Sequence, residues 1–134
     1  MIGKALGGGE VEKENQRIKL TKRLLREALL RLLEKKTIDK INITELCNEA
    51  GINRATFYRH YAVPADVLLD IEMEFVEKVN AAFDITATHD ITGYLEGLCS
   101  YLYDNSELVK IFVSNNSEED FTVLINNIFS GFIK

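Results

Sequence analysis

The residues that most restrict the fold of this chain are 41–61, INITELCNEAGINRATFYRHY, which predict two short helices joined by a glycine turn. Asn42 is a good N-cap, and Glu45 stands three residues later, the spacing at which a carboxylate reaches back to the amide of the cap residue. Gly51 ends the first helix, because glycine adopts the left-handed conformation at little cost. Asn53 is then the N-cap of a second helix, which follows at once.

The second helix, RATFYRHY, carries different chemistry on its two sides. Phe57 and Tyr61 are four residues apart and share one face, which predicts that they pack into a core. The opposite face and its flanks carry Arg54, Ala55, Thr56, Tyr58, Arg59 and His60. Two short helices joined by a tight turn form a helix-turn-helix, and its second helix enters the major groove of DNA.

This geometry assigns a role to each side chain. Arg54 is placed to reach a base edge, since arginine pairs two donors with guanine O6 and N7. Ala55 is small and lets the helix sit deep, and Thr56 offers a methyl group and a hydroxyl to a base or phosphate. Phosphate contacts, which fix register without reading sequence, are expected from Thr44, Tyr58, Arg59 and His60.

Three of these residues also have a simpler interpretation. Tyr58 fits a half-buried core aromatic, because amphipathic tyrosines often pack. His60 fits a histidine satisfied inside an interface, and Arg59 fits a solvated helix face.

The net charge of −5 conceals a strong asymmetry along the 134 residues. Residues 1–63 hold 13 Lys and Arg against 8 Asp and Glu, a balance of +5, whereas residues 64–134 hold 3 against 13, a balance of −10. This division favours a basic part that meets a polyanion and an acidic part with another task.

Helical spacing extends over most of the remaining chain. It predicts a helix from about Thr21, a long helix after Pro64, and three further helices, over about 91–103, 107–114 and 118–133. The long helix carries its apolar stripe on Leu68, Ile71, Phe75 and Val79. The last helix begins with a serine cap and an acidic turn, and its apolar face consists of Phe121, Leu124, Ile125, Ile128, Phe129 and Phe132. We expect Gly93 and Gly97 to mark close helix packing.

The N-terminus is expected to be a flexible arm over residues 1–17, because GGG with mixed charge gives little reason for structure. No run of residues is long and apolar enough to span a membrane, and no signal peptide is predicted. Cys47 and Cys99 lie in apolar helical patterns, which predicts buried thiols in a reducing cytoplasm.

ITELCNEAGINRATFYRHY closely resembles the DNA-binding domain of TetR-family transcription regulators, over roughly residues 20–75. Ala50 to Asn53, Phe57–Tyr58 and His60–Tyr61 occupy the places that this family's pattern prescribes. The segment YLEGLCSYLYDNSELVKIF resembles, more loosely, the branch around the dihydroxyacetone kinase regulator. The resemblance implies an all-α fold, with a three-helix DNA-binding domain over 18–63 and a helical regulatory and dimerisation domain over 64–134.

The resemblance also implies a function. It indicates a ligand-responsive repressor that acts as a homodimer on a double-stranded DNA operator in the bacterial cytoplasm, associated with the nucleoid and without a cofactor. A small effector would bind between the helices of the second domain, in a pocket lined by Tyr94, Leu98, Cys99, Tyr101, Leu102 and Phe112. A plain helical core is the simpler interpretation of any one of these residues.

The chain departs from the family pattern in two places. Pro64 stands where a lysine usually contacts phosphate at the head of the next helix, so that contact is missing. The family usually pairs through two final helices beyond about residue 134, so the regulatory domain is expected to be incomplete. An uncovered apolar face over 121–132 then predicts self-association.

Other classes of function are less well supported. The chain has two histidines, no zinc-ligand spacing and no phosphate loop, which argues against an enzyme. A transcriptional activator or coactivator of the same fold remains an alternative. A non-enzymatic adapter that binds a protein through the acidic half is the alternative from a different class.

Overall fold

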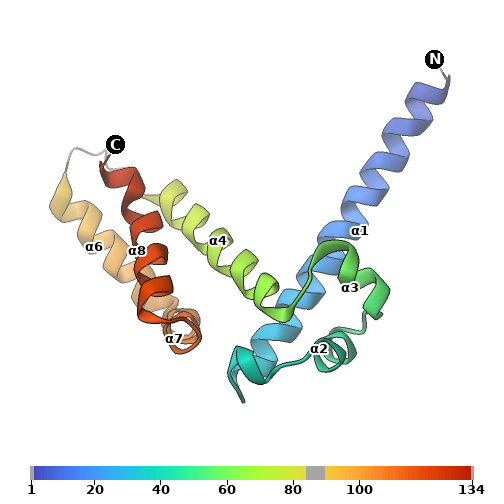
Figure 1. Ribbon diagram of the computed structural model, residues 1–134. Coiled ribbons are helices and arrows are strands. Elements are labelled where there is room, and N and C mark those ends of the chain that lie inside the picture. The colour runs from blue at the N-terminus through green and yellow to red at the C-terminus, as the bar shows by residue number, and fades with distance from the viewer. Residues whose placement is uncertain (1, 84–89, 134) are drawn as a thin grey trace. The chain divides into compact units, whose positions relative to one another are not determined.

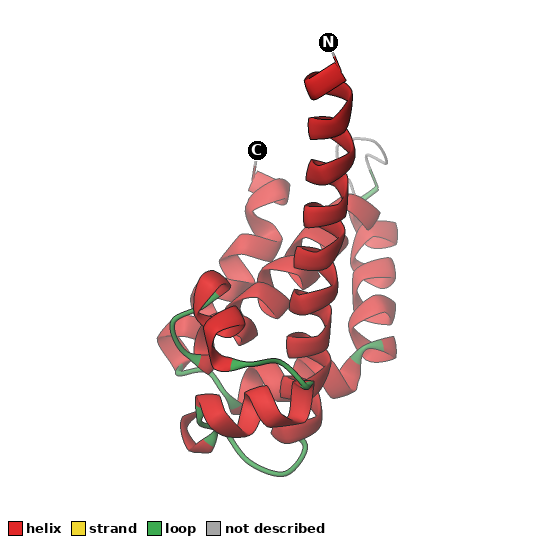
Figure 2. Cartoon of the chain, turned by 90° about the vertical axis from the view of Figure 1, so that its right-hand side faces the viewer, coloured by secondary structure: helices red, strands yellow, loops and turns green. Residues whose placement is uncertain are grey.

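The computed structural model describes the backbone of residues 2–83 and 90–133 and the side chains of residues 9–83 and 90–127. All regular structure in these ranges is helical (Figures 1 and 2). The helices are α1 (Ile2–Leu33), the short 3-10 helix η1 (Ile38–Lys40), α2 (Ile43–Ala50), α3 (Arg54–His60), α4 (Pro64–Ala82), α6 (Ile91–Asp104), α7 (Ser106–Ser114) and α8 (Glu118–Ile133). The chain forms two compact units, Met1–Leu68 and Leu69–Lys134. The all-α expectation is therefore confirmed.

Helix α1 begins far earlier than the sequence analysis expected. Residues 2–17, assigned to a flexible arm, continue the same helix. The side chains of residues 9–17 are all exposed, so no core packing holds this segment. Lys, Glu, Gln and Arg are good helix formers, and adding residues to an existing helix costs far less than nucleating one. The expectation of an arm overlooked this propagation from the packed part of α1.

The turn between α2 and α3 has the conformation that the asparagine and glycine pattern predicted. The Asn42 side chain accepts a hydrogen bond from the Glu45 amide at 2.8 Å, and the Asn53 side chain accepts one from the Thr56 amide at 2.8 Å. Gly51 has φ 71° and ψ 30°, the left-handed conformation. The Gly51 and Ile52 amides donate to the carbonyls of Asn48 and Cys47, which makes a Schellman motif. The direction in which α3 leaves α2 is thus fixed by local hydrogen bonds.

The second half of the expected capping box does not form. The Glu45 carboxylate accepts from the Lys36 ammonium through Oε2, and its buried Oε1 has no hydrogen-bond partner. An ammonium attracts a carboxylate more strongly than a neutral amide does, which explains this choice. Glu45 consequently links Lys36, in the segment after α1, to α2, and it does not cap the N-terminus of α2.

The first unit is held together by apolar side chains from all four of its α-helices. Its fully buried members are Leu25, Ala28, Leu29, Leu46, Phe57 and Val67. Figure 1 shows α2 and α3 beside the C-terminal half of α1. This core leaves one side of α3 to the solvent.

The second unit is built around aromatic rings. Phe75 of α4 packs against Tyr101 and Phe112, with ring centroids 5.8 and 5.4 Å apart. Phe83 packs against Tyr94 and Tyr101, at 6.2 and 5.8 Å. These five rings link α4, α6 and α7 and are called the aromatic cluster below.

The expected stripe of α4 and the serine cap of α8 are both confirmed. Leu68, Ile71, Phe75 and Val79 are all buried. The Ser117 hydroxyl accepts from the Asp120 amide at 3.1 Å. Of the expected apolar face of α8, Leu124 is buried and Phe121 and Ile125 are half-buried. The side chains of Ile128, Phe129 and Phe132 lie outside the described residues.

Two expectations about small residues are corrected. Cys47 is buried, but Cys99 is exposed, because the side of α6 that packs carries Tyr94 and Leu98 instead. A Cβ on Gly97 would lie 2.7 Å from Cε1 of Phe83, so Gly97 does mark close packing. A Cβ on Gly93 would meet only the side chain of Asp90 in the preceding turn, so Gly93 does not.

None of the helices within the described ranges combines the length and the apolar composition that crossing a bilayer requires.

Candidate nucleic-acid interface

Helix α3 separates its residues into a buried and an exposed side. Phe57 is completely buried and Tyr61 is 7% exposed, as expected for core positions. The exposed side carries Arg54, Ala55, Tyr58 and Arg59, and Thr56 and His60 are half-buried at its edges. These six residues are called the α3 face below. Tyr58 is 51% exposed, so the interpretation of this residue as a half-buried core aromatic is wrong.

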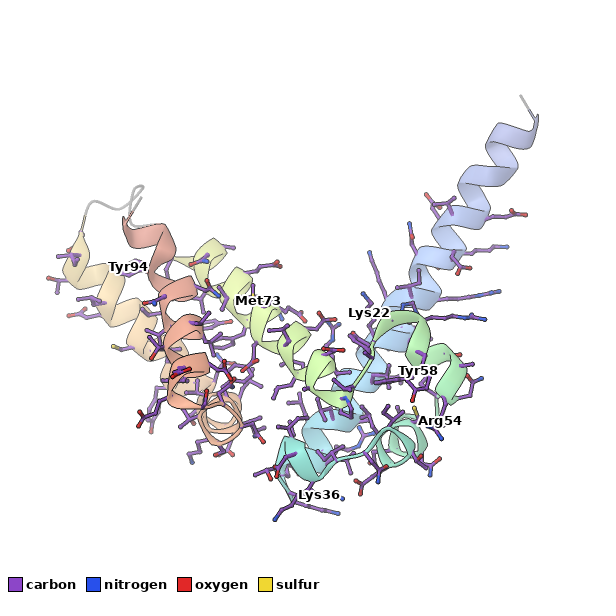
Figure 3. The ribbon with its side chains drawn as sticks, in the orientation of Figure 1. Lys22, Lys36, Arg54, Tyr58, Met73 and Tyr94 are labelled. Carbon is purple, nitrogen blue, oxygen red and sulfur yellow. The ribbon has the colours of Figure 1, made fainter. Side chains whose placement is uncertain are left out.

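Arg54 and Tyr58 form a contact on the α3 face. The guanidinium Nη2 of Arg54 donates to the Tyr58 hydroxyl at 3.4 Å, and the guanidinium carbon lies 6.0 Å from the centre of the tyrosine ring. This hydrogen bond is the main reason that the pKa of Arg54 is raised. Figure 3 shows both side chains on α3. The contact is weak, because it is 3.4 Å long and both side chains are exposed.

The base of α3 is supported by aromatic packing. The Phe57 ring meets Tyr58 edge to face and Tyr61 at a tilt, each with a centroid distance of 5.7 Å. On the α1 side, the Lys22 ammonium lies 5.9 Å from the centre of the Tyr61 ring. Tyr61 ends α3, so Lys22 brings a positive charge from α1 to the C-terminal end of α3 (Figure 3).

Thr44 is exposed in the first turn of α2, in a cleft of about 530 Å³. The cleft is lined by Leu32, Lys36, Asn42, Thr44, Glu45, Asn48 and Glu49. Two cations near it are already engaged by carboxylates: Lys36 by Glu45, and Arg31 by Glu49 at 2.8 Å. Thr44 is therefore accessible, but its surroundings are less positive than those of the α3 face.

The junction between α3 and α4 is closed by an aspartate. The Asp66 carboxylate accepts hydrogen bonds from the amides of Ala62 and Val63, at 2.9 and 3.2 Å. Pro64 is buried as the first residue of α4, a position that needs no amide donor. These two hydrogen bonds depend on how the chain turns between α3 and α4, so the sequence alone does not predict them. Asp66, two residues after Pro64, thus stabilises this junction by binding backbone amides of the same chain.

The six residues expected to line an effector pocket are distributed between core and surface. Tyr94, Leu98 and Phe112 are buried, Tyr101 and Leu102 are half-buried, and Cys99 is exposed. Three of them, Tyr94, Tyr101 and Phe112, belong to the aromatic cluster. These three rings pack against the rings of Phe75 and Phe83.

Two notable side chains were missed by the sequence analysis. Lys22 has no role in the sequence analysis, because its position beside the Tyr61 ring depends on the tertiary structure. Glu72 is 6% exposed and accepts a hydrogen bond from the side-chain amide of Asn116. Burial raises the pKa of Glu72, the Asn116 hydrogen bond opposes that rise, and the negative charge of Asp120 adds to it. Its position directly after Ile71, beside the apolar stripe, was the available signal.

Among the residues that the structure describes, no three His, Cys, Asp or Glu side chains are grouped to hold a metal ion. In the comparisons with known proteins, no family model, no curated protein and no solved structure matches this chain.

Proposed function

We propose that this chain is a sequence-specific regulator of transcription that binds double-stranded DNA through the α3 face, in the manner of TetR-family repressors. The observation that carries the proposal is the division of α3 into two sides. Two aromatic residues anchor the helix, and the side turned to solvent carries two arginines, a tyrosine and a small residue. A helix with this division fits the major groove, with arginine at a base edge and further donors at phosphates.

The rigid connection between α2 and α3 supports the same proposal. Two asparagine caps and the Schellman turn at Gly51 fix the angle between the two helices by local hydrogen bonds. A reading helix held in this way loses little entropy on binding, which favours specific recognition. The excess of Lys and Arg over residues 1–63 supplies the attraction to a polyanion.

In this proposal the chain acts as a homodimer without a cofactor, in the bacterial cytoplasm and at the nucleoid, and has no enzymatic activity. The second unit supplies the surface for pairing. Its large exposed apolar side chains include Ile91, Leu95, Tyr103, Val113 and Val123. An effector would act by changing the population of orientations of α4, which connects the two units, and thereby the spacing of two α3 helices. The same reading face would also serve an activator.

The adapter hypothesis gains support from the same exposed apolar side chains, because they offer a surface to a protein partner as well as to a second copy. It leaves the α3 face without a role. For that reason the DNA-binding regulator is the function that we favour.

The test is the salt dependence of duplex binding by the full chain. A reader of DNA should bind a mixed-sequence duplex at low salt and weaken steeply as salt rises, because cations are released from the phosphates. Selection of bound duplexes from a random pool then supplies a preferred sequence for comparison. If affinity for every duplex stays negligible at low salt, while a protein partner binds, the adapter hypothesis replaces the proposal.

A further inference from the structure

The chain passes from α3 to α4 through a short turn, and hydrogen bonds restrain its backbone at successive residues. The Tyr61 amide donates to the Phe57 carbonyl at 2.9 Å, and the Tyr61 side chain is held in the core at 7% exposure. The amides of Ala62 and Val63 both donate to Oδ2 of Asp66, at 2.9 and 3.2 Å. These two hydrogen bonds to Asp66 are called the Asp66 clamp below.

The turn is restrained from the α4 side as well. The Asp66 amide donates back to the Val63 carbonyl at 3.0 Å, so these two residues are joined in both directions. Pro64 stands between them as the first residue of α4, and its ring fixes the backbone φ. Since each residue from Tyr61 to Pro64 is restrained by a hydrogen bond or by a ring, the turn has little freedom to bend. The last turn of α3 and the first turn of α4 should therefore move as one piece.

The Asp66 clamp sets a direction more than it adds stability. Ala62 and Val63 are exposed, so water would bond to their amides if the Asp66 carboxylate were removed. Helix α3 is anchored in the core by Phe57 and α4 by Val67, and both side chains are completely buried. Loss of the clamp would thus leave both helices packed, but it would loosen the turn that fixes the angle between them.

We propose that Asp66 is a positioning residue for base reading: its clamp holds α3 at one angle to α4, so that Arg54 meets a base edge in a single orientation. This inference rests on the proposed function and assigns to it a residue outside α3. A hydrogen bond to a base edge weakens steeply when its angle changes, whereas the attraction to phosphates carries no sequence information. A loosened turn should therefore lower the preference for a selected sequence more than the affinity for DNA in general.

The experiment compares two substitutions of equal charge in the full chain. Asp66→Ala removes the acceptor, and Asp66→Asn removes the charge but keeps an oxygen that can accept two hydrogen bonds. A difference between these variants therefore reports on the clamp and not on the charge. Glu77→Gln, at an exposed position of α4, shows the effect of one lost negative charge alone. Affinity is measured for a mixed-sequence duplex, and for a duplex selected with the parent from a random pool, over a series of salt concentrations.

The ratio of the affinity for the selected duplex to that for the mixed-sequence duplex is the decisive quantity. Asp66→Ala should lower this ratio about fivefold or more, the lower end of what one arginine–guanine pair is worth. Asp66→Asn and Glu77→Gln should keep a ratio near that of the parent. The two Asp66 variants should bind the mixed-sequence duplex equally, with the same dependence on salt.

Amide hydrogen exchange tests the Asp66 clamp without DNA. In the free chain, the amides of Ala62 and Val63 should exchange faster in Asp66→Ala than in the parent, because their acceptor is gone. They should remain protected in Asp66→Asn. Equal exchange in the parent and both variants would show that the clamp does not form, and would overturn the inference whatever the DNA measurements give.

Three results with DNA would also overturn it. A parent-like ratio in Asp66→Ala would mean that the clamp plays no part in reading, and an equal fall in both Asp66 variants would assign the effect to the charge. Equal losses on both duplexes in Asp66→Ala would mean that Asp66 is merely structural. In each case the parent still prefers the selected duplex, so the proposed function stands. If the parent binds no duplex at low salt, the proposed function fails and the positioning role fails with it.

Discussion

Arg54 and Tyr58 lie one turn apart on the α3 face and contact each other. The hydrogen bond between them is 3.4 Å long and exposed, so it is weak by itself. It still places the guanidinium beside the tyrosine hydroxyl. The two residues should therefore act as a unit when DNA binds.

A double-mutant cycle tests this coupling on a selected duplex. Arg54→Ala should cost ~1–3 kcal/mol of binding and relax the preference at one base pair, if the arginine reads guanine. Tyr58→Phe keeps the ring and removes the hydroxyl. Because the hydroxyl holds Arg54, the double variant should lose less than the sum of the two single losses. Additive losses, with Tyr58→Phe weakening all sequences alike, would mean that Tyr58 only holds a phosphate.

Glu72 is the buried carboxyl with the clearest consequence for stability. Burial raises its pKa in the folded chain, so the folded state keeps a proton at a pH where the unfolded chain has lost it. The unfolded state then binds fewer protons, and stability falls as pH rises from the usual glutamate pKa through the raised one. At any pH above both pKa values, the folded chain remains destabilised by the buried charge of Glu72.

The substitution Glu72→Gln should remove this decrease of stability with rising pH. The variant keeps an oxygen that accepts from Asn116, and it has no charge to bury. Its stability relative to the parent should therefore improve as pH rises through the window above the usual glutamate pKa, as measured by urea unfolding at several pH values. Glu77→Gln on the exposed side of α4 is the matched control and should follow the parent. A constant difference between Glu72→Gln and the parent at all pH values would contradict the raised pKa.

At the scale of the elements, local hydrogen bonds made part of this fold readable from the sequence. Asn42, Gly51 and Asn53 act within four residues of themselves, and the structure has each in the expected role. Features that depend on tertiary neighbours were not readable. The Glu45 carboxylate selects Lys36 from another segment. Cys99 is exposed because other residues of α6 form its packed side.

In the candidate site, too, local features could be predicted from the sequence and features that depend on tertiary contacts could not. The division of α3 into buried and exposed residues comes from helical spacing, and the structure agrees with it at Phe57, Tyr61 and Tyr58. The alignment of α1 with α3 through Lys22 depends on how two helices cross, and spacing along the sequence does not contain that information. What α3 binds is a question of chemistry that the fold alone leaves to experiment.

The packing of α6 yields a prediction with an internal control. A Cβ on Gly97 would lie 2.7 Å from the Phe83 ring, and Phe83 contacts two further rings of the aromatic cluster. Gly97→Ala should therefore destabilise the second unit by about 1–3 kcal/mol through overpacking. Gly93→Ala meets only the flexible side chain of Asp90 and should be much milder. Urea unfolding measures the stability of both variants. If the two substitutions destabilise the chain equally, the Phe83 ring moves aside without cost and the overpacking argument is wrong.

At the scale of the whole molecule, the charge is divided much as the two units are. The basic residues collect in the part with α1, α2 and α3, and residues 64–134 have a balance of −10. An acidic second part would repel DNA, so the charge division favours the first unit as the part that a polyanion would contact. The same repulsion would act between two copies, so the proposed pairing of the second units must rely on apolar contact.

The arrangement of the preferred DNA site tests pairing and reading together. If two copies pair, their α3 helices should contact half-sites about one helical turn apart, roughly 34 Å or a modest extension of it. A duplex selected from a random pool with the full chain should then contain an inverted repeat with that spacing. Sedimentation of the complex should find two copies per duplex. Removing one of the two half-sites should reduce affinity far more than twofold. Once the first α3 helix is bound, the second meets its half-site at a high effective concentration. An enriched single site with one copy bound would instead mean that each chain reads DNA alone, and the pairing through the second unit would be wrong.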